Sequence, residues 1–85
     1  MTGTRARILV VEDDPSIVLG LRLNLESEGY DVTALTDGQD ALEALRAGSW
    51  DLVVLDIMLP RRNGYEIISD MRRRGDHTPI VVLTA

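Results

Sequence analysis

The stretch ILVVEDDP, residues 8–15, joins four consecutive aliphatic residues to three carboxylates and a proline. A run that is apolar at every position, rather than at alternate positions, is typical of a strand buried on both faces of a parallel sheet. The acids cannot enter such a sheet, so we expect them at its edge, where the strand ends. This stretch predicts a layered fold and indicates where its chemistry lies.

Further segments extend the same pattern along the chain. Two more aliphatic runs predict buried strands, and a segment that alternates apolar and polar residues suits the edge of a sheet. Between them lie helical patterns, the first capped by Asp14 with Pro15 at its first position and with Ile17, Leu21 and Leu25 on its inward face. The predicted strands are residues 8–11, 30–35, 52–55 and 80–83, and the predicted helices are residues 15–28, 38–47 and 64–74. Strands that alternate with helices predict an α/β fold with a parallel sheet.

Composition excludes several classes of function. The chain has 85 residues, which allows one domain, and its net charge of -5 argues against direct nucleic-acid binding. No apolar run approaches the length of a membrane span, and the N-terminus lacks the pattern of a signal peptide. The absence of cysteine excludes disulfides and thiolate metal sites. We therefore expect a cytoplasmic protein that contacts neither membrane nor nucleic acid.

Polar side chains follow three of the predicted strands. Glu12 and Asp13 follow the first, Asp56 the third and Thr84 the fourth. Parallel neighbouring strands lie about 4.8 Å apart, so these groups should converge at one edge of the sheet. Carboxylates this near to one another are stabilised when one of them binds a proton or when a cation binds between them. Oxygen ligands without histidine or cysteine select Mg²⁺, Mn²⁺ or Ca²⁺, and an open set with a hydroxyl opposite favours Mg²⁺ and an anionic phosphoryl group.

Each of these residues taken alone has a simpler interpretation. Asp14 before Pro15 is a helix cap, Glu12-Asp13 could form a solvated turn, and threonine is common in strands. Only their combination with Asp56 favours a site. A Mg²⁺-binding α/β hydrolase or phosphatase is the least favoured alternative, because no separate general acid or water-activating residue is evident.

The segments ILVVEDD, DLVVLDIMLPRRNGYEI and TPIVVLTA resemble the receiver domain of bacterial two-component response regulators over essentially the whole chain. The resemblance implies a flavodoxin-like fold and a signalling module rather than a metabolic enzyme. It implies that Asp56 accepts a phosphoryl group from a sensor histidine kinase, that Thr84 is the switch hydroxyl, and that the backbone N–H of Ala85 contacts the phosphoryl group. The segments look most like the subclass with a C-terminal winged-helix DNA-binding domain.

The same resemblance implies a metal site. Its Mg²⁺ ligands would be Asp13 and Asp56 directly, Glu12 through water and the backbone carbonyl of Met58, and Mn²⁺ would also suit them. The aspartyl phosphate would form and hydrolyse by the chain's own catalysis.

The sequence departs from the family at its end. The family has a fifth strand with flanking helices and a lysine that pairs with the phosphoryl group, whereas residues 1–85 end after the predicted fourth strand and contain no lysine. We therefore expect an incomplete receiver of four strands and three helices. Its unpaired edge at Val81-Val82-Leu83 predicts self-association through the fourth strand or exchange of elements. The alternative function is a truncated or degenerate receiver, acting as a non-phosphorylated interaction or dimerisation module.

Three other features have open or structural interpretations. Arg61 and Arg62 could attract a phosphodonor, pair with the acidic cluster or simply face solvent. Trp50 is expected to pack or cap, and His77 to lie in a solvated loop before Pro79.

Overall fold

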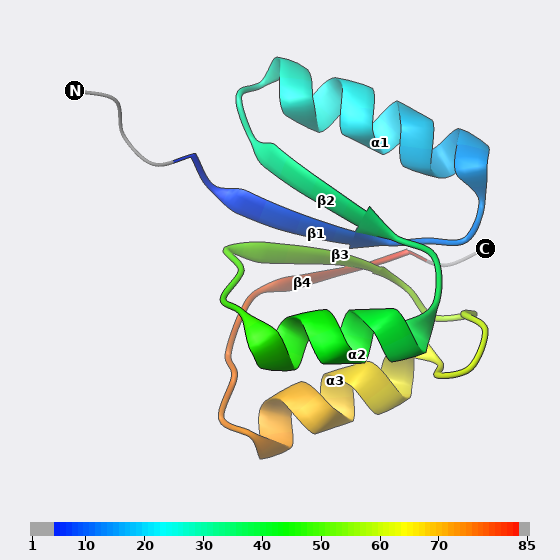
Figure 1. Cartoon of the computed structure of the whole chain (residues 1–85), viewed down its shortest axis with the longest axis vertical. Coiled ribbons are helices and arrows are strands. Elements are labelled where there is room, and N and C mark those ends of the chain that lie inside the picture. The colour runs from blue at the N-terminus through cyan, green and yellow to red at the C-terminus, as the bar shows by residue number, and fades with distance from the viewer. Residues whose placement is uncertain (1–4, 84–85) are drawn as a thin grey trace.

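The computed structural model describes residues 5–83, which form a four-stranded parallel sheet with helices on both faces (Figure 1). The elements are β1 (Arg7–Val11), α1 (Pro15–Ser27), β2 (Asp31–Leu35), α2 (Gly38–Ala47), β3 (Leu52–Asp56), α3 (Gly64–Arg73) and β4 (Ile80–Leu83). The predicted α/β fold is confirmed, and each element lies within one residue of its expected bounds. No helix in this described range is long and apolar enough to cross a membrane.

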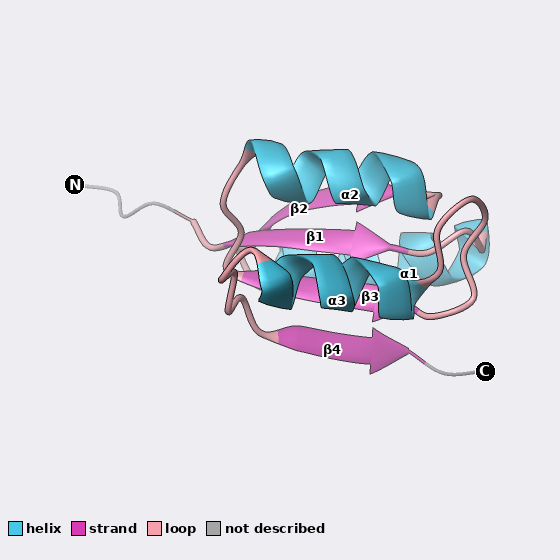
Figure 2. Cartoon of the chain, turned by 90° about the horizontal axis from the view of Figure 1, so that it is seen from below, coloured by secondary structure: helices cyan, strands magenta, loops and turns pink. Residues whose placement is uncertain are grey.

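The strand order is β2-β1-β3-β4, and all neighbouring strands are parallel (Figure 2). The two central strands, β1 and β3, are the two continuous aliphatic runs expected to be buried. In their register Val11 lies opposite Leu55, so the residues after these positions leave the sheet side by side. The alternating segment forms β2 at one edge, as expected, and β4 forms the other edge.

The larger core lies between the sheet and the pair α2 and α3. Alternate residues of β1 and β3 point to this face, because successive side chains of a strand point to opposite sides. The buried residues of this core are Leu9, Val11, Ala41, Leu45, Val53, Leu55, Ile67 and Met71. This packing holds the first turns of α2 and α3 against the carboxyl edge of the sheet.

The opposite face carries a smaller core under α1 alone. Leu21 and Leu25 of α1 pack against the buried residues Ile8, Val10, Val32 and Val54. The expectation that Ile17 also faces inward was wrong, because its side chain is 44% exposed at the start of the helix. One helix cannot cover this face of a four-stranded sheet.

The edge strand β4 exposes apolar surface, as predicted. Val81 and Val82 point to opposite faces of the sheet, and they are 48% and 43% exposed. Pairing with β3 satisfies only one side of β4. The strand therefore presents an unpaired hydrophobic edge within the described residues.

Side-chain caps place the start of each helix near the carboxyl edge of the sheet. Asp14 Oδ1 accepts from the backbone N–H of Ser16 at 2.9 Å, as expected for the cap of α1. Asp37 Oδ1 accepts from the N–H of Asp40 at 2.9 Å at the start of α2. Asn63 and Glu66 form a reciprocal capping box at the start of α3. These caps also fix the loops that surround the strand ends.

Candidate functional site

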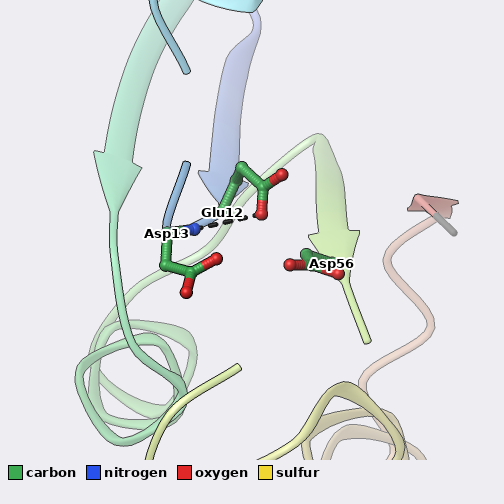
Figure 3. A group of neighbouring side chains, drawn as sticks. All are labelled: Glu12, Asp13 and Asp56. Atoms are coloured by element: carbon green, nitrogen blue, oxygen red, sulfur yellow. Dashed lines mark hydrogen bonds between the residues drawn. The ribbon is translucent and has the colours of Figure 1, made fainter. Parts of the chain in front are cut away.

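Three carboxylates meet at the carboxyl edge of the sheet (Figure 3). Glu12 and Asp13 follow β1, and Asp56 ends the neighbouring β3. One carboxylate oxygen from each lies within 4.8 Å of the others. The parallel register explains this convergence, because Val11 and Leu55 are partners and the next residue of each strand carries an acid.

The three carboxylates differ in exposure and in hydrogen bonding. Glu12 is buried with 4% of its surface exposed, Asp56 is half-buried and Asp13 is exposed. The N–H of Asp13 donates to Glu12 Oε2 at 3.0 Å, and the N–H of Met58 donates to Asp56 Oδ1 at 3.1 Å. These bonds orient the acids and supply little compensating positive charge.

Electrostatics at this edge oppose full ionisation. Burial, together with the hydrogen bond and charge of neighbouring Asp56, raises the pKa of Glu12 to about 7, while the hydrogen bond from the N–H of Asp13 acts in the opposite direction. A pKa raised this far means that the cluster resists carrying all of its negative charges, so added positive charge is favoured there. The donor set is oxygen only, which suits a hard cation such as Mg²⁺.

A hollow of about 390 Å³ opens beside the acids. The residues that line it are Glu12, Asp13, Asp14, Ile17, Asp56, Met58 and Leu83. Ile17 and Leu83 belong to this lining although sequence reasoning assigned them only to the core and the sheet edge. The sequence did hold a signal for this role: Ile17 follows the acids closely at the start of α1, and Leu83 ends β4 at the same edge of the sheet. Apolar side chains of α1 and β4 therefore lie beside the carboxylates.

The two arginines after Asp56 do not pair with the acidic cluster. Arg61 pairs with Asp37 at 2.8 Å and with Asp40 at 3.3 Å, whereas Arg62 pairs with Glu66 at 3.3 Å. Both guanidinium groups therefore form ion pairs with acids at the starts of α2 and α3. Of the interpretations left open by the sequence, pairing with the acidic cluster is wrong.

The other singled-out residues lie away from the acids. Trp50 packs against the larger core and donates from Nε1 to the carbonyl of Ala44 at 3.2 Å, in agreement with its expected packing role. His77 is exposed in the loop before β4. Thr84 and Ala85, the expected phosphoryl contacts, lie outside the described residues.

Comparison with known proteins gives matches along nearly the full chain. The model of the response regulator receiver domain family matches residues 8–85. The transcriptional regulatory protein DltR of Streptococcus agalactiae is 47% identical over 79 residues, which are 93% of this chain and 35% of DltR. The chain thus spans about one third of the length of such curated relatives.

Two solved structures show the same fold. One is the receiver domain of the sensor histidine kinase PA1611 from Pseudomonas aeruginosa, with a magnesium ion coordinated in the active site cleft. It has a TM-score of 0.90 and 33% identity, covering 96% of this chain and 69% of that one. The other is the complex of histidine kinase ThkA with response regulator TrrA, where the TM-score is 0.84 and the identity 39%, covering 94% of this chain and 69% of the matched one. The chain belongs to the response regulator receiver domain family of two-component signalling.

Proposed function

We propose that this chain accepts a phosphoryl group on Asp56 from the phosphohistidine of a sensor histidine kinase and acts as a signalling switch. The convergence of Glu12, Asp13 and Asp56 within 4.8 Å carries the proposal. The complex of ThkA with TrrA supports a kinase as partner, since it joins a histidine kinase to a response regulator that shares this fold.

In the proposed reaction a carboxylate oxygen of Asp56 attacks the phosphorus of the phosphohistidine. The new O–P bond forms as the P–N bond breaks, and the imidazole keeps the electron pair of the broken bond and regains a proton. The N–H of Met58 orients Asp56 through its 3.1 Å hydrogen bond.

The proposed metal ligands are Asp13, Asp56, the carbonyl of Met58 and, through water, Glu12. Mg²⁺ bound by these residues, or Mn²⁺ in its place, would offset the negative charge of the incoming phosphoryl group. Thr84 and the N–H of Ala85 are proposed to contact the phosphoryl oxygens. We also propose that the chain hydrolyses its own aspartyl phosphate.

Phosphorylation by a small donor tests this function. The chain is incubated with Mg²⁺ and acetyl phosphate, and intact-mass spectrometry measures the addition of one phosphoryl group. Asp56→Asn should abolish the adduct, while Asp31→Asn, which changes an exposed acid at the start of β2, should retain it. A wild-type chain that stays unmodified would instead favour the alternative function, a non-phosphorylated interaction or dimerisation module.

A specific observation supports self-association as a second proposal. Val81 and Val82 are exposed on the edge strand β4, whose outer side has no partner strand among residues 5–83. We propose that a second copy pairs with this edge or exchanges elements with it, because exposed hydrophobic edges template strand pairing. Size-exclusion chromatography with light scattering measures the mass, and a monomer at all concentrations contradicts this proposal.

The proposed compartment is the cytoplasm, and no direct nucleic-acid contact is proposed for these residues. Their net charge of -5 repels a phosphate backbone. DltR is by name a transcriptional regulatory protein, and we propose gene regulation here as the process that phosphorylation controls.

A further inference from the structure

Arg61 adopts an unusual backbone conformation in the loop after the proposed phosphoacceptor. Its φ of 66° lies in the left-handed region, which no other non-glycine residue in the described part of the chain adopts. A residue with a Cβ is strained there, and such strain persists only where surrounding contacts hold it. The contacts that hold Arg61 therefore indicate what this conformation is for.

The guanidinium group of Arg61 contacts the first turn of α2. Its terminal nitrogen donates to Asp37 Oδ2 at 2.8 Å and to Asp40 Oδ1 at 3.3 Å. Asp37 is the N-cap of α2, and its other oxygen accepts from the N–H of Asp40. That N–H and the guanidinium of Arg61 both lower the pKa of Asp37, so the pair stays charged.

The backbone of the same loop also contacts α2. The N–H of Gly38 donates to the carbonyl of Pro60 at 3.0 Å, and the N–H of Arg62 donates to the same carbonyl at 2.8 Å. A Cβ on Gly38 would collide with the carbonyl oxygen of Arg62. The start of α2 and the loop after β3 are therefore in direct backbone contact. The ion pair of Arg61 with Asp37 adds a side-chain contact between the same two segments.

The other end of the loop is held against β3 and α3. The N–H of Gly64 donates to the carbonyl of Ile57 at 2.8 Å, as does the N–H of Leu59 at 3.1 Å. Leu59 packs against the larger core. Met58 thus lies in a short bridge between the anchor at Ile57 and the contact of Pro60 with α2.

We propose that Arg61 is a positioning residue, whose ion pair with Asp37 fixes the path of residues 58–60 and thereby the position of the Met58 carbonyl for Mg²⁺. This inference rests on the proposed function, because it assigns to Arg61 a role in the same metal site. Arg61 does not itself reach the acids; it acts through the loop.

Three variants of the 85-residue chain test the role of Arg61. Arg61→Gly removes the guanidinium and permits the same positive φ, Arg61→Lys keeps the charge, and Asp37→Asn keeps an acceptor for the helix cap but removes its charge. Arg22→Ala is the matched control, because it breaks an exposed pair with Glu26 on α1. Circular dichroism establishes that each variant is folded.

Two measurements report on the loop. Isothermal titration calorimetry should show Mg²⁺ affinity reduced about tenfold in Arg61→Gly, the smaller end of the loss that follows removal of an outer-shell partner. Asp37→Asn should show a similar loss, and Arg61→Lys and Arg22→Ala should stay near wild type. In the metal-free chain, the amide of Gly38 should exchange its hydrogen faster in Arg61→Gly than in Arg22→Ala.

The outcomes separate this inference from the proposed function. If the wild type binds Mg²⁺ and Arg61→Gly binds it within about twofold as tightly, a difference too small for an outer-shell partner, the positioning role is overturned. If Arg61→Lys loses as much affinity as Arg61→Gly, the ion pair is not the cause and the proposal also fails. If the wild type itself binds no Mg²⁺ and forms no adduct with acetyl phosphate, the proposed function fails and this inference falls with it.

Discussion

Glu12 and Asp56 bring their carboxylate oxygens within 4.8 Å at the ends of neighbouring strands, and Glu12 is buried. Burial and the negative charge of Asp56 both oppose ionisation of Glu12. The pair therefore destabilises the metal-free fold at neutral pH. The same repulsion is what a bound cation relieves.

Replacing Glu12 with Gln should stabilise the metal-free chain while weakening Mg²⁺ binding. Glutamine keeps the shape and removes the charge that burial and Asp56 oppose, so the free energy of unfolding should rise by at least about 1 kcal/mol, the amount that corresponds to one unit of pKa. Urea denaturation at pH 7.5 measures this change, and calorimetry measures the Mg²⁺ affinity. Glu26→Gln on α1 is the control, and a less stable Glu12→Gln chain would contradict the prediction.

The contact of α2 with the loop after β3 predicts a strong effect at Gly38. A Cβ there meets the backbone carbonyl of Arg62, so Gly38→Ala should destabilise the chain by about 1–3 kcal/mol, as overpacking does. Gly20→Ala is the matched control, because its Cβ meets no atom within 4 Å in the middle of α1, and it should stabilise by about 0.5–1 kcal/mol. Thermal unfolding measures the stability of both variants. Equal changes in stability for Gly38→Ala and Gly20→Ala would show that α2 and the loop are not in firm contact.

Asp70 should make the fold sensitive to acid. Hydrogen bonds from Arg46 at 2.7 Å and Arg74 at 2.9 Å lower the pKa of Asp70 to about 2. Because the folded pKa lies below the ordinary value of 3.8, the stabilisation is complete above pH 3.8 and disappears as pH falls through about 2.

The variant Asp70→Asn tests this window. Its free energy of unfolding should be lower than that of wild type at pH 5, and the difference should shrink between pH 3.8 and about 2. Urea titrations at several pH values supply the measurement. A difference that stays constant down to pH 2 would show that the arginines contribute by packing rather than by charge.

The exposed edge of β4 predicts that one charge reduces self-association. Val82→Lys places an ammonium group on the free edge, where lysine opposes strand pairing. Light scattering should therefore show a lower mass for this variant than for wild type at the same concentration. Leu23→Lys is the control, because Leu23 is 62% exposed on α1, away from β4. Equal masses for wild type and Val82→Lys would place the contact elsewhere.

Local chemistry made much of this protein predictable from its sequence. The continuous aliphatic runs Ile8–Val11 and Leu52–Leu55 indicated buried parallel strands, and both form the centre of the sheet. Asp14 was identifiable as a cap because its side chain satisfies backbone groups only a few residues away. The convergence of Glu12 and Asp13 with Asp56 followed from acids placed directly after two such strands.

Tertiary packing decided what local patterns could not. The exposure of Ile17 depends on how much of the sheet α1 covers, and the partners of Arg61 come from a helix more than twenty positions earlier in the chain. Nothing in the sequence around Arg61 indicates its positive φ, and the carboxylate of Asp37 that its side chain contacts is brought beside it only by the fold. The sequence by itself determined the elements, their caps and the acids at their ends, because those depend on neighbours along the chain. Only the fold decided how deeply Glu12 is buried and how the loop beside Asp56 is held, because burial and ion pairing depend on neighbours in space.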